Sequence, residues 1–165
     1  MGKDRGRRSR LRFRTLVRWL WYFETCPVTA DEVILRRIPN VMNYYNPSLP
    51  ESPILFESFR PNDQRDTDGI SLNRLDFVTR KQLARRSQNK NGTYIASFKV
   101  ADLNNLGLTV ESSPTPNDLP GHVIIPELRF SNYESNKKKY KPLLYELAKL
   151  AMKYPIFGPT MPRAN

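Results

Sequence analysis

Hydrophobic and polar residues alternate with the period of a β-strand in several short runs along the chain. The clearest run is residues 93–100, which are rich in β-branched and aromatic side chains. Further runs predict strands at residues 33–38, 70–73, 108–111 and 121–126, and a short strand or turn at 54–60. Segments rich in Asn, Pro and Gly separate these runs, including an Asp-Gly and an Asn-Gly turn. Short strands joined by such turns indicate a small sheet.

Two segments show the period of an amphipathic helix instead. Residues 143–154 repeat apolar side chains at helical spacing. Pro142 stands where a proline in the first helical turn is tolerated, and Pro155 ends the helix. Residues 10–24 form the second segment. On this predicted helix, arginines occupy the face next to the apolar face. The apolar arc of this segment consists of Phe13, Leu16, Val17, Leu20 and Phe23.

Shorter helical segments complete the prediction. Residues 101–107 predict a single helical turn, and residues 75–87 predict a short helix whose inward side chains are Phe77, Leu83 and Ala84. The fold class that follows is α+β, with a small mixed or antiparallel sheet, a C-terminal helix and a basic N-terminal helix. We divide the chain into a basic N-terminal arm (1–30), an α+β domain (31–154) and an extended tail (155–165).

The charge of the chain is unevenly distributed. The 165 residues carry a net charge of +11, of which +6 belongs to residues 1–25 and +5 to the other 140 residues. A second basic cluster, with no acidic residue inside it, consists of Arg80, Lys81, Arg85, Arg86 and Lys90. A third consists of Lys137, Lys138, Lys139 and Lys141. The arm is therefore strongly basic, and the rest of the chain only mildly so.

The basic arm is the clearest candidate for binding a partner. Guanidinium groups pair with phosphate oxygens, and aromatic side chains among them can stack on unpaired bases, which favours RNA over duplex DNA. The predicted contacts from the arm are Arg7, Arg8, Arg10, Arg12, Arg14, Arg18 and Trp19, joined by Arg80, Lys81, Arg85, Arg86 and Lys90 of the second cluster. Three other roles fit the same arm. It can lie on an anionic membrane surface, act as an organellar transit segment, or pack on the domain or a partner protein.

The sequence holds few residues of the kinds that metal sites and disulfides need. Its single cysteine, Cys26, excludes an intramolecular disulfide and a cysteine-rich zinc site, and its single histidine, His122, excludes a two-histidine metal motif. The acidic loop of Asp63, Asp66 and Asp68 fails the spacing of a calcium loop, so we interpret it as solvated. No phosphate-binding glycine motif is present, and neither a metal nor a cofactor is expected.

An ordered series of short motifs runs through residues 33–128. The motifs are Leu35–Pro39, Phe59–Pro61, Asp68–Ser71, Asp102–Leu103, Leu106–Leu108 and Gly121–Val123. The series resembles a family of small uncharacterised bacterial proteins found near mobile and defence-associated genes. That family supplies no activity, but the resemblance implies that a common site is lined by Arg37, Arg60, Asp68, Ser71 and His122. The opening LRRIP is also similar to the start of RES-type ADP-ribosyltransferase-like domains, whose arginine engages NAD. The glycine-rich stretch expected after it is absent here.

Three functions follow as hypotheses. The first is a non-enzymatic accessory protein of a bacterial defence or mobile-element system, which binds a phosphate backbone through its arm while its body contacts a protein partner. The second is an enzyme, either ADP-ribosyltransferase-like or a nuclease, with Arg37, Arg60, Ser71 and His122 as catalytic candidates. The third is an antitoxin or immunity-type interaction module.

The sequence predicts a cytoplasmic protein without a transmembrane span. Its longest near-apolar stretch, residues 15–23, is interrupted by Arg18. A membrane-spanning helix needs about 20 apolar residues, and this stretch is shorter.

Overall fold

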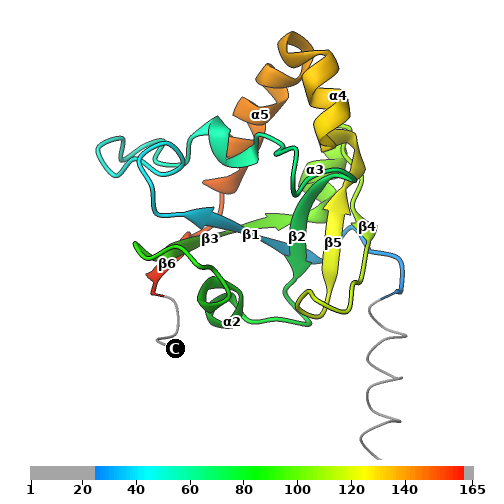
Figure 1. Ribbon diagram of the computed structural model, residues 1–165, viewed down its shortest axis with the longest axis horizontal. Coiled ribbons are helices and arrows are strands. Elements are labelled where there is room, and N and C mark those ends of the chain that lie inside the picture. The colour runs from blue at the N-terminus through cyan, green and yellow to red at the C-terminus, as the bar shows by residue number, and fades with distance from the viewer. Residues whose placement is uncertain (1–24, 162–165) are drawn as a thin grey trace, which may run out of the picture.

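The computed structural model describes residues 25–161 of the chain (Figure 1). The predicted basic helix at residues 10–24 lies outside the described residues. So do the arm residues proposed to bind nucleic acid, which are Arg7, Arg8, Arg10, Arg12, Arg14, Arg18 and Trp19.

The centre of the domain is a six-stranded antiparallel sheet. Its strands lie in the order β4-β5-β2-β1-β3-β6, and all the pairs between neighbours are antiparallel. The strands are β1 (Val33–Pro39), β2 (Ile70–Arg74), β3 (Thr93–Lys99), β4 (Glu111–Ser112), β5 (His122–Ile125) and β6 (Phe157–Thr160). Together with the helices, this sheet confirms the predicted α+β class and the antiparallel alternative for the sheet.

The helices cover the two faces of the sheet unequally (Figure 1). Within residues 25–161, one face carries most of them, while α2 alone lies against the other. The elements are the 3-10 helices η1 (Phe56–Phe59) and η2 (Pro126–Leu128), and the α-helices α2 (Arg80–Arg85), α3 (Val100–Asn105), α4 (Phe130–Ser135) and α5 (Lys137–Ala151). Part of the α2 face is therefore left without a helix above it.

Strand alternation divides the core between these two faces. Ile34 and Ile38 of β1 point into the larger cluster, which includes the buried side chains of α5. Leu35 points the other way, into a smaller cluster with Leu83 and Ala84 of α2. Burying a side chain such as leucine contributes about 1.5–3 kcal/mol, so the larger cluster supplies most of the stability.

Two of the predicted elements in the first half of the chain differ from the structure. For residues 54–60 the sequence left a short strand or a turn open, and the structure has a single bridge at Ile54 followed by the 3-10 helix η1, so the strand alternative is wrong. The helix predicted at 75–87 is confined to Arg80–Arg85, although Leu83 and Ala84 are buried as predicted. It begins there because Thr79 and Gln82 form a reciprocal capping box, in which each side chain accepts the backbone N–H of the other residue.

The second half of the chain differs in three places. The strand expected at residues 108–111 is reduced to the pair Glu111–Ser112. The last helix begins at Lys137 rather than near residue 142, because the Asn136 side chain accepts the backbone N–H of Lys139, so Pro142 lies inside the helix. Part of the extended tail is the edge strand β6, which pairs with β3, so the sheet continues beyond residue 154.

Candidate functional site

The sheet separates between β1 and β2, and a cleft opens at this point. β1 pairs with β3 from Val33 to Pro39, but it pairs with β2 only at Ile34 and Leu35. The cleft has a volume of about 1140 Å³ and runs from the end of α2 across β1 and β2 to η1 and the junction of α4 with α5.

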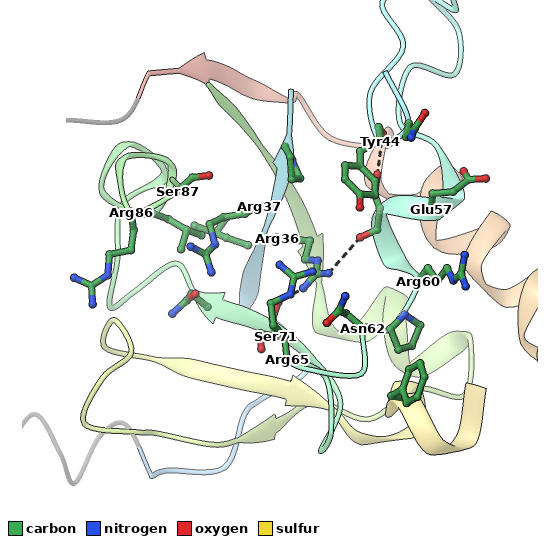
Figure 2. Close-up of a pocket in the computed structure, with 18 of the residues that line it drawn as sticks. Arg36, Arg37, Tyr44, Glu57, Arg60, Asn62, Arg65, Ser71, Arg86 and Ser87 are labelled. Atoms are coloured by element: carbon green, nitrogen blue, oxygen red, sulfur yellow. Dashed lines mark hydrogen bonds between the residues drawn. The ribbon is translucent and has the colours of Figure 1, made fainter. Parts of the chain in front are cut away.

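Cationic side chains outnumber acidic ones in the lining of this cleft. Five of the nine arginines in residues 25–161 line it, and Figure 2 shows Arg36 and Arg65 in its middle, Arg86 towards one end and Arg60 towards the other. The complete cationic set is Arg36, Arg37, Arg60, Arg65, Arg86 and Lys137. The acidic side chains that line it are Glu57, Asp63, Asp118 and Glu134.

These acidic residues leave the arginine charges without direct partners. Glu134 pairs with Lys137 at 2.6 Å, and the Asp118 carboxylate accepts the hydroxyl of Thr115. None of the five cleft arginines has a carboxylate within ion-pair distance in the part of the chain that the structure describes. The cleft therefore concentrates positive charge that an anionic ligand would neutralise.

Arg36 occupies the gap between β1 and β2 (Figure 2). Its Nη1 donates to the Ser71 carbonyl at 2.7 Å and its Nη2 to the Ser58 carbonyl at 3.2 Å, in place of sheet hydrogen bonds. Burial of the guanidinium group is the main cause that lowers the pKa of Arg36 to about 10. The charge of Asp66 opposes this fall, and the charges of Arg65 and Arg37 add to it.

Arg37 points to the opposite side of β1 and enters the cleft from there. Arg37 is exposed, but the surrounding cleft removes part of the water around its guanidinium group. This partial loss of water is the main cause that lowers the pKa of Arg37. Arg65 and Arg86 lower this pKa further by charge, while Asp118 raises it. The charges of these arginines therefore oppose one another in the lining, and an anion bound there would relieve this repulsion.

The two ends of the cleft hold arginines with weaker tethers. Arg86 donates through Nη2 to the Asn117 carbonyl at 3.0 Å, and the Arg60 guanidinium lies 5.8 Å from the ring centre of Tyr133. Both side chains are exposed. They are placed to contact a ligand that extends beyond the middle of the cleft.

His122 also lines the cleft, at the start of β5. It is 8% exposed, and its Nδ1 lies 2.6 Å from the Ser113 carbonyl and 3.8 Å from the Asp118 carboxylate. A carbonyl oxygen only accepts hydrogen bonds, so Nδ1 must carry the proton. In the neutral ring, Nε2 is then the unprotonated nitrogen, which is the arrangement a general base requires.

The four residues that the sequence offered as catalytic candidates meet in this cleft. Arg37, Arg60, Ser71 and His122 all line it, although they come from four separate segments of the chain. Asp68, which the resemblance adds to the same site, is exposed on the loop before β2 and is not part of the lining.

The basic cluster around α2 contributes one residue to the cleft lining. Arg86 lines the cleft, but the guanidinium of Arg80 turns to the Ser97 hydroxyl, with Nη2 at 3.2 Å from it. Lys81 and Lys90 are exposed, and Arg85 is partly buried outside the cleft lining. Arg86 is therefore the only member of the predicted cluster that lines the candidate site in residues 25–161.

Sequence reasoning missed two residues at the centre of the site. Arg36 stands beside Arg37 in a strand whose other residues are apolar, and charges in such a strand are a signal of special placement. Arg65 stands among the acids of a loop that we interpreted as solvated. Asp66 of that loop is instead 2% exposed, and its carboxylate accepts the backbone N–H of Asn62 at 2.8 Å, which folds the loop toward the cleft.

The comparisons give this site no relative. No protein-family model, curated protein or solved structure matches the chain. Among the described residues, no group of three or more His, Cys, Asp and Glu side chains is arranged to hold a metal ion. No helix within residues 25–161 is long and apolar enough to cross a membrane.

Proposed function

We propose that the protein binds the phosphate groups of nucleic acid in the arginine-lined cleft, with RNA preferred over duplex DNA. The observation that carries the proposal is the meeting of Arg36, Arg37, Arg60, Arg65 and Arg86 in one cleft, without an ion-paired carboxylate among the described residues. Guanidinium groups bind phosphate oxygens in paired hydrogen bonds, so this set matches a phosphate-bearing ligand.

The shape of the cleft supports a single strand rather than a duplex. Its volume of about 1140 Å³ lies slightly above the usual range for small-molecule sites, which leaves room for more than one nucleotide. Tyr44 and Phe130 stand in the lining beside the arginines. Aromatic side chains can stack on unpaired bases, which single-stranded RNA presents and duplex DNA does not.

The basic arm extends this proposal. Its arginines would add phosphate contacts to those of the cleft and raise the affinity for a long strand. In the same proposal the protein is an accessory component of a bacterial defence or mobile-element system, and its α+β body contacts a partner protein. The resemblance of residues 33–128 to proteins found near such genes is what supports this setting.

A salt titration tests the binding proposal. The affinity of the full chain for labelled single-stranded RNA and for duplex DNA is measured by fluorescence anisotropy at several salt concentrations. We expect RNA to bind more tightly and its affinity to fall with salt, with a logarithmic slope of roughly −0.7 for each phosphate contacted. Affinity without salt dependence would contradict the proposal.

Matched variants locate the binding surface. Arg86→Gln removes a charge from the cleft, and Arg85→Gln removes a charge from the neighbouring position outside it. We expect the first to weaken binding and reduce the salt slope, and the second to change the affinity much less. A chain without residues 1–25 should bind less tightly but retain the difference between the two variants. If the difference disappears in both chains, the cleft is not the binding surface.

A second function has one specific observation in its favour. Arg37, Arg60, Ser71 and His122 line the same cleft, and the Nδ1 contact of His122 leaves its Nε2 free to accept a proton. An enzyme, a nuclease or an NAD-using transferase, would need such a base beside arginines. Incubation with end-labelled RNA, and separately with NAD, tests this function. Cleavage or turnover that His122→Asn abolishes supports it, and no turnover by the wild-type chain contradicts it.

A further inference from the structure

The centre of the cleft contains a guanidinium group that the protein itself does not fully satisfy. Arg36 donates through Nη1 and Nη2 to two backbone carbonyls, but its Nε is buried and has no hydrogen-bond partner in residues 25–161. A buried donor left without an acceptor costs free energy, and so does a buried cation without a counter-ion. Arg36 has both deficits at the same place.

Asp66, the acidic residue that raises the pKa of Arg36, does not remove these deficits. Asp66 acts on the guanidinium by charge but lies outside ion-pair distance, and its carboxylate accepts the backbone N–H of Asn62. The loop that Asp66 closes also carries Arg65. Asp66 therefore stabilises the conformation of the loop, and the loop places Arg65 in the cleft lining.

Two further guanidinium groups lie beside Arg36. Arg37 and Arg65 both line the cleft, and neither has a side-chain hydrogen bond to an acceptor within the described residues. The charge of Arg65 contributes to the lowered pKa of both Arg36 and Arg37, and all three residues line the same cleft. Like charges gathered in this way repel one another unless an anion lies between them.

We propose that Arg36, Arg37 and Arg65 form a subsite for a terminal phosphate monoester, the charged end of a nucleotide or oligonucleotide. This inference rests on the proposed binding of nucleic acid, and it names the part of the ligand that the centre of the cleft recognises. Figure 2 shows Arg36 and Arg65 together near Ser71, whose segment forms one wall.

The choice of a monoester over a phosphodiester follows from charge and geometry. A monoester carries close to two negative charges at neutral pH and offers three oxygen acceptors on one side. A diester carries one charge and is attached to the chain on both sides. Three arginines that line one cleft, without a carboxylate at ion-pair distance among the described residues, match the first arrangement better.

The test compares short oligoribonucleotides of one sequence that differ only in their ends. One carries a 5′-phosphate, one a 3′-phosphate, and one a hydroxyl group at both ends, and adenosine monophosphate serves as a free nucleotide. Affinities for the full-length chain are measured by isothermal titration calorimetry at one salt concentration. We expect a phosphorylated end to increase affinity by roughly tenfold to a hundredfold over the hydroxyl-ended strand.

The outcomes separate this inference from the proposed function. Preference for the 5′- or the 3′-phosphate identifies the end that is bound, and strong binding of adenosine monophosphate alone identifies a free nucleotide as the ligand. Equal affinity for all three strands overturns the inference while leaving nucleic-acid binding intact. Failure of every probe to bind overturns both.

Two variants test the assignment of residues. Arg36→Met should abolish the preference for a phosphorylated end, while Arg129→Met, a matched change at an exposed arginine outside the cleft lining, should preserve it. Since Arg36 also bonds two carbonyls, its variant can lose stability. Arg65→Gln changes an exposed loop residue and should reduce the preference without unfolding the domain. If both cleft variants fold and retain the preference, the subsite is assigned wrongly.

Discussion

Arg36 and Arg74 lie on neighbouring strands, but their guanidinium groups have different surroundings. Arg74 is 6% exposed, and its Nε and Nη2 donate to the two carboxylate oxygens of Glu32 at 2.6 and 2.9 Å. The Arg74 guanidinium also donates to the Cys26 carbonyl and lies 4.9 Å from the ring centre of Phe77. Arg36 is partly buried, has two carbonyl partners, and has no carboxylate at ion-pair distance among the described residues.

The difference shows that the counter-ion, rather than burial, separates a structural arginine from one available to a ligand. The charge of Arg74 is neutralised inside the fold, so this residue joins β2 to the segment before β1. The charge of Arg36 is left in a cleft that other arginines also line. The first should matter mainly for stability, and the second mainly for binding. Four predictions test this division.

The largest effect is expected on stability, when Arg74 loses its counter-ion. Glu32→Ala leaves the Arg74 guanidinium buried without its counter-ion, which should lower the free energy of unfolding by about 3–5 kcal/mol. Urea denaturation measures this change. Glu111→Ala, at an exposed acid on β4, is the matched control and should stay within about 0.5 kcal/mol of the wild type. RNA affinity per folded molecule should not change, and a loss of affinity in Glu32→Ala would remove the division between the two arginines.

The next largest effect is the stabilisation of the fold by a bound ligand, which should depend on Arg36. A 5′- or 3′-phosphorylated oligoribonucleotide at about 100 times its Kd should raise the free energy of unfolding by about 2.7 kcal/mol. Thermal denaturation with and without the strand measures this. At the same strand concentration the gain should persist in Arg129→Met and largely disappear in Arg36→Met. An equal gain in both variants would show that Arg36 does not contact the ligand.

The sequence predicted the strands β1 and β2 better than the gap between them. Alternation along residues 33–38 and 70–73 fixes which apolar side chains face the core, and this is a local property that a single strand reveals. It also places Arg36 and Arg37 on opposite faces. It does not reveal that β1 and β2 separate beyond Leu35, because that depends on the loop 60–69 and on η1 inserting beside them.

The site was predicted in part for the same reason. The motifs around Arg37, Arg60, Ser71 and His122 led to residues that do line one cleft. Arg65 was missed because its role depends on the buried carboxylate of Asp66, which shapes a loop that looks only polar in the sequence. Likewise, the basic run from Arg80 to Lys90 looks continuous in the sequence. Among the basic residues of this run, however, Arg86 lines the cleft while the Arg80 guanidinium lies against the Ser97 hydroxyl.

A smaller effect is expected on the stability of the Arg36 variant itself. Arg36→Met leaves the Ser71 and Ser58 carbonyls without their donor, which should cost about 1–3 kcal/mol. Removing a buried cation that has no counter-ion offsets part of this cost. Urea denaturation should therefore show a smaller loss than for Glu32→Ala. A loss as large as that of Glu32→Ala would mean that Arg36 is as structural as Arg74.

The smallest effect concerns an ion pair at the surface, which extends the comparison to a charge that water already solvates. Lys153 lies 2.8 Å from the Asp102 carboxylate, which also accepts the Tyr154 hydroxyl at 2.8 Å. The hydrogen bonds from Lys153 and then from Tyr154 lower the pKa of Asp102 below its usual value. Because the pKa of Asp102 is lower in the folded state, the charged carboxylate stabilises the fold above about pH 4, and this contribution is lost as the pH falls further.

Asp102→Asn should therefore lower Tm slightly at pH 7, and less at pH 3, in thermal denaturation at both pH values. A difference that grew on acidification would show that the carboxylate is not stabilised in its charged form. A loss at pH 7 comparable to that of Glu32→Ala would show that an ion pair at the surface stabilises the fold as much as the buried Arg74–Glu32 pair does.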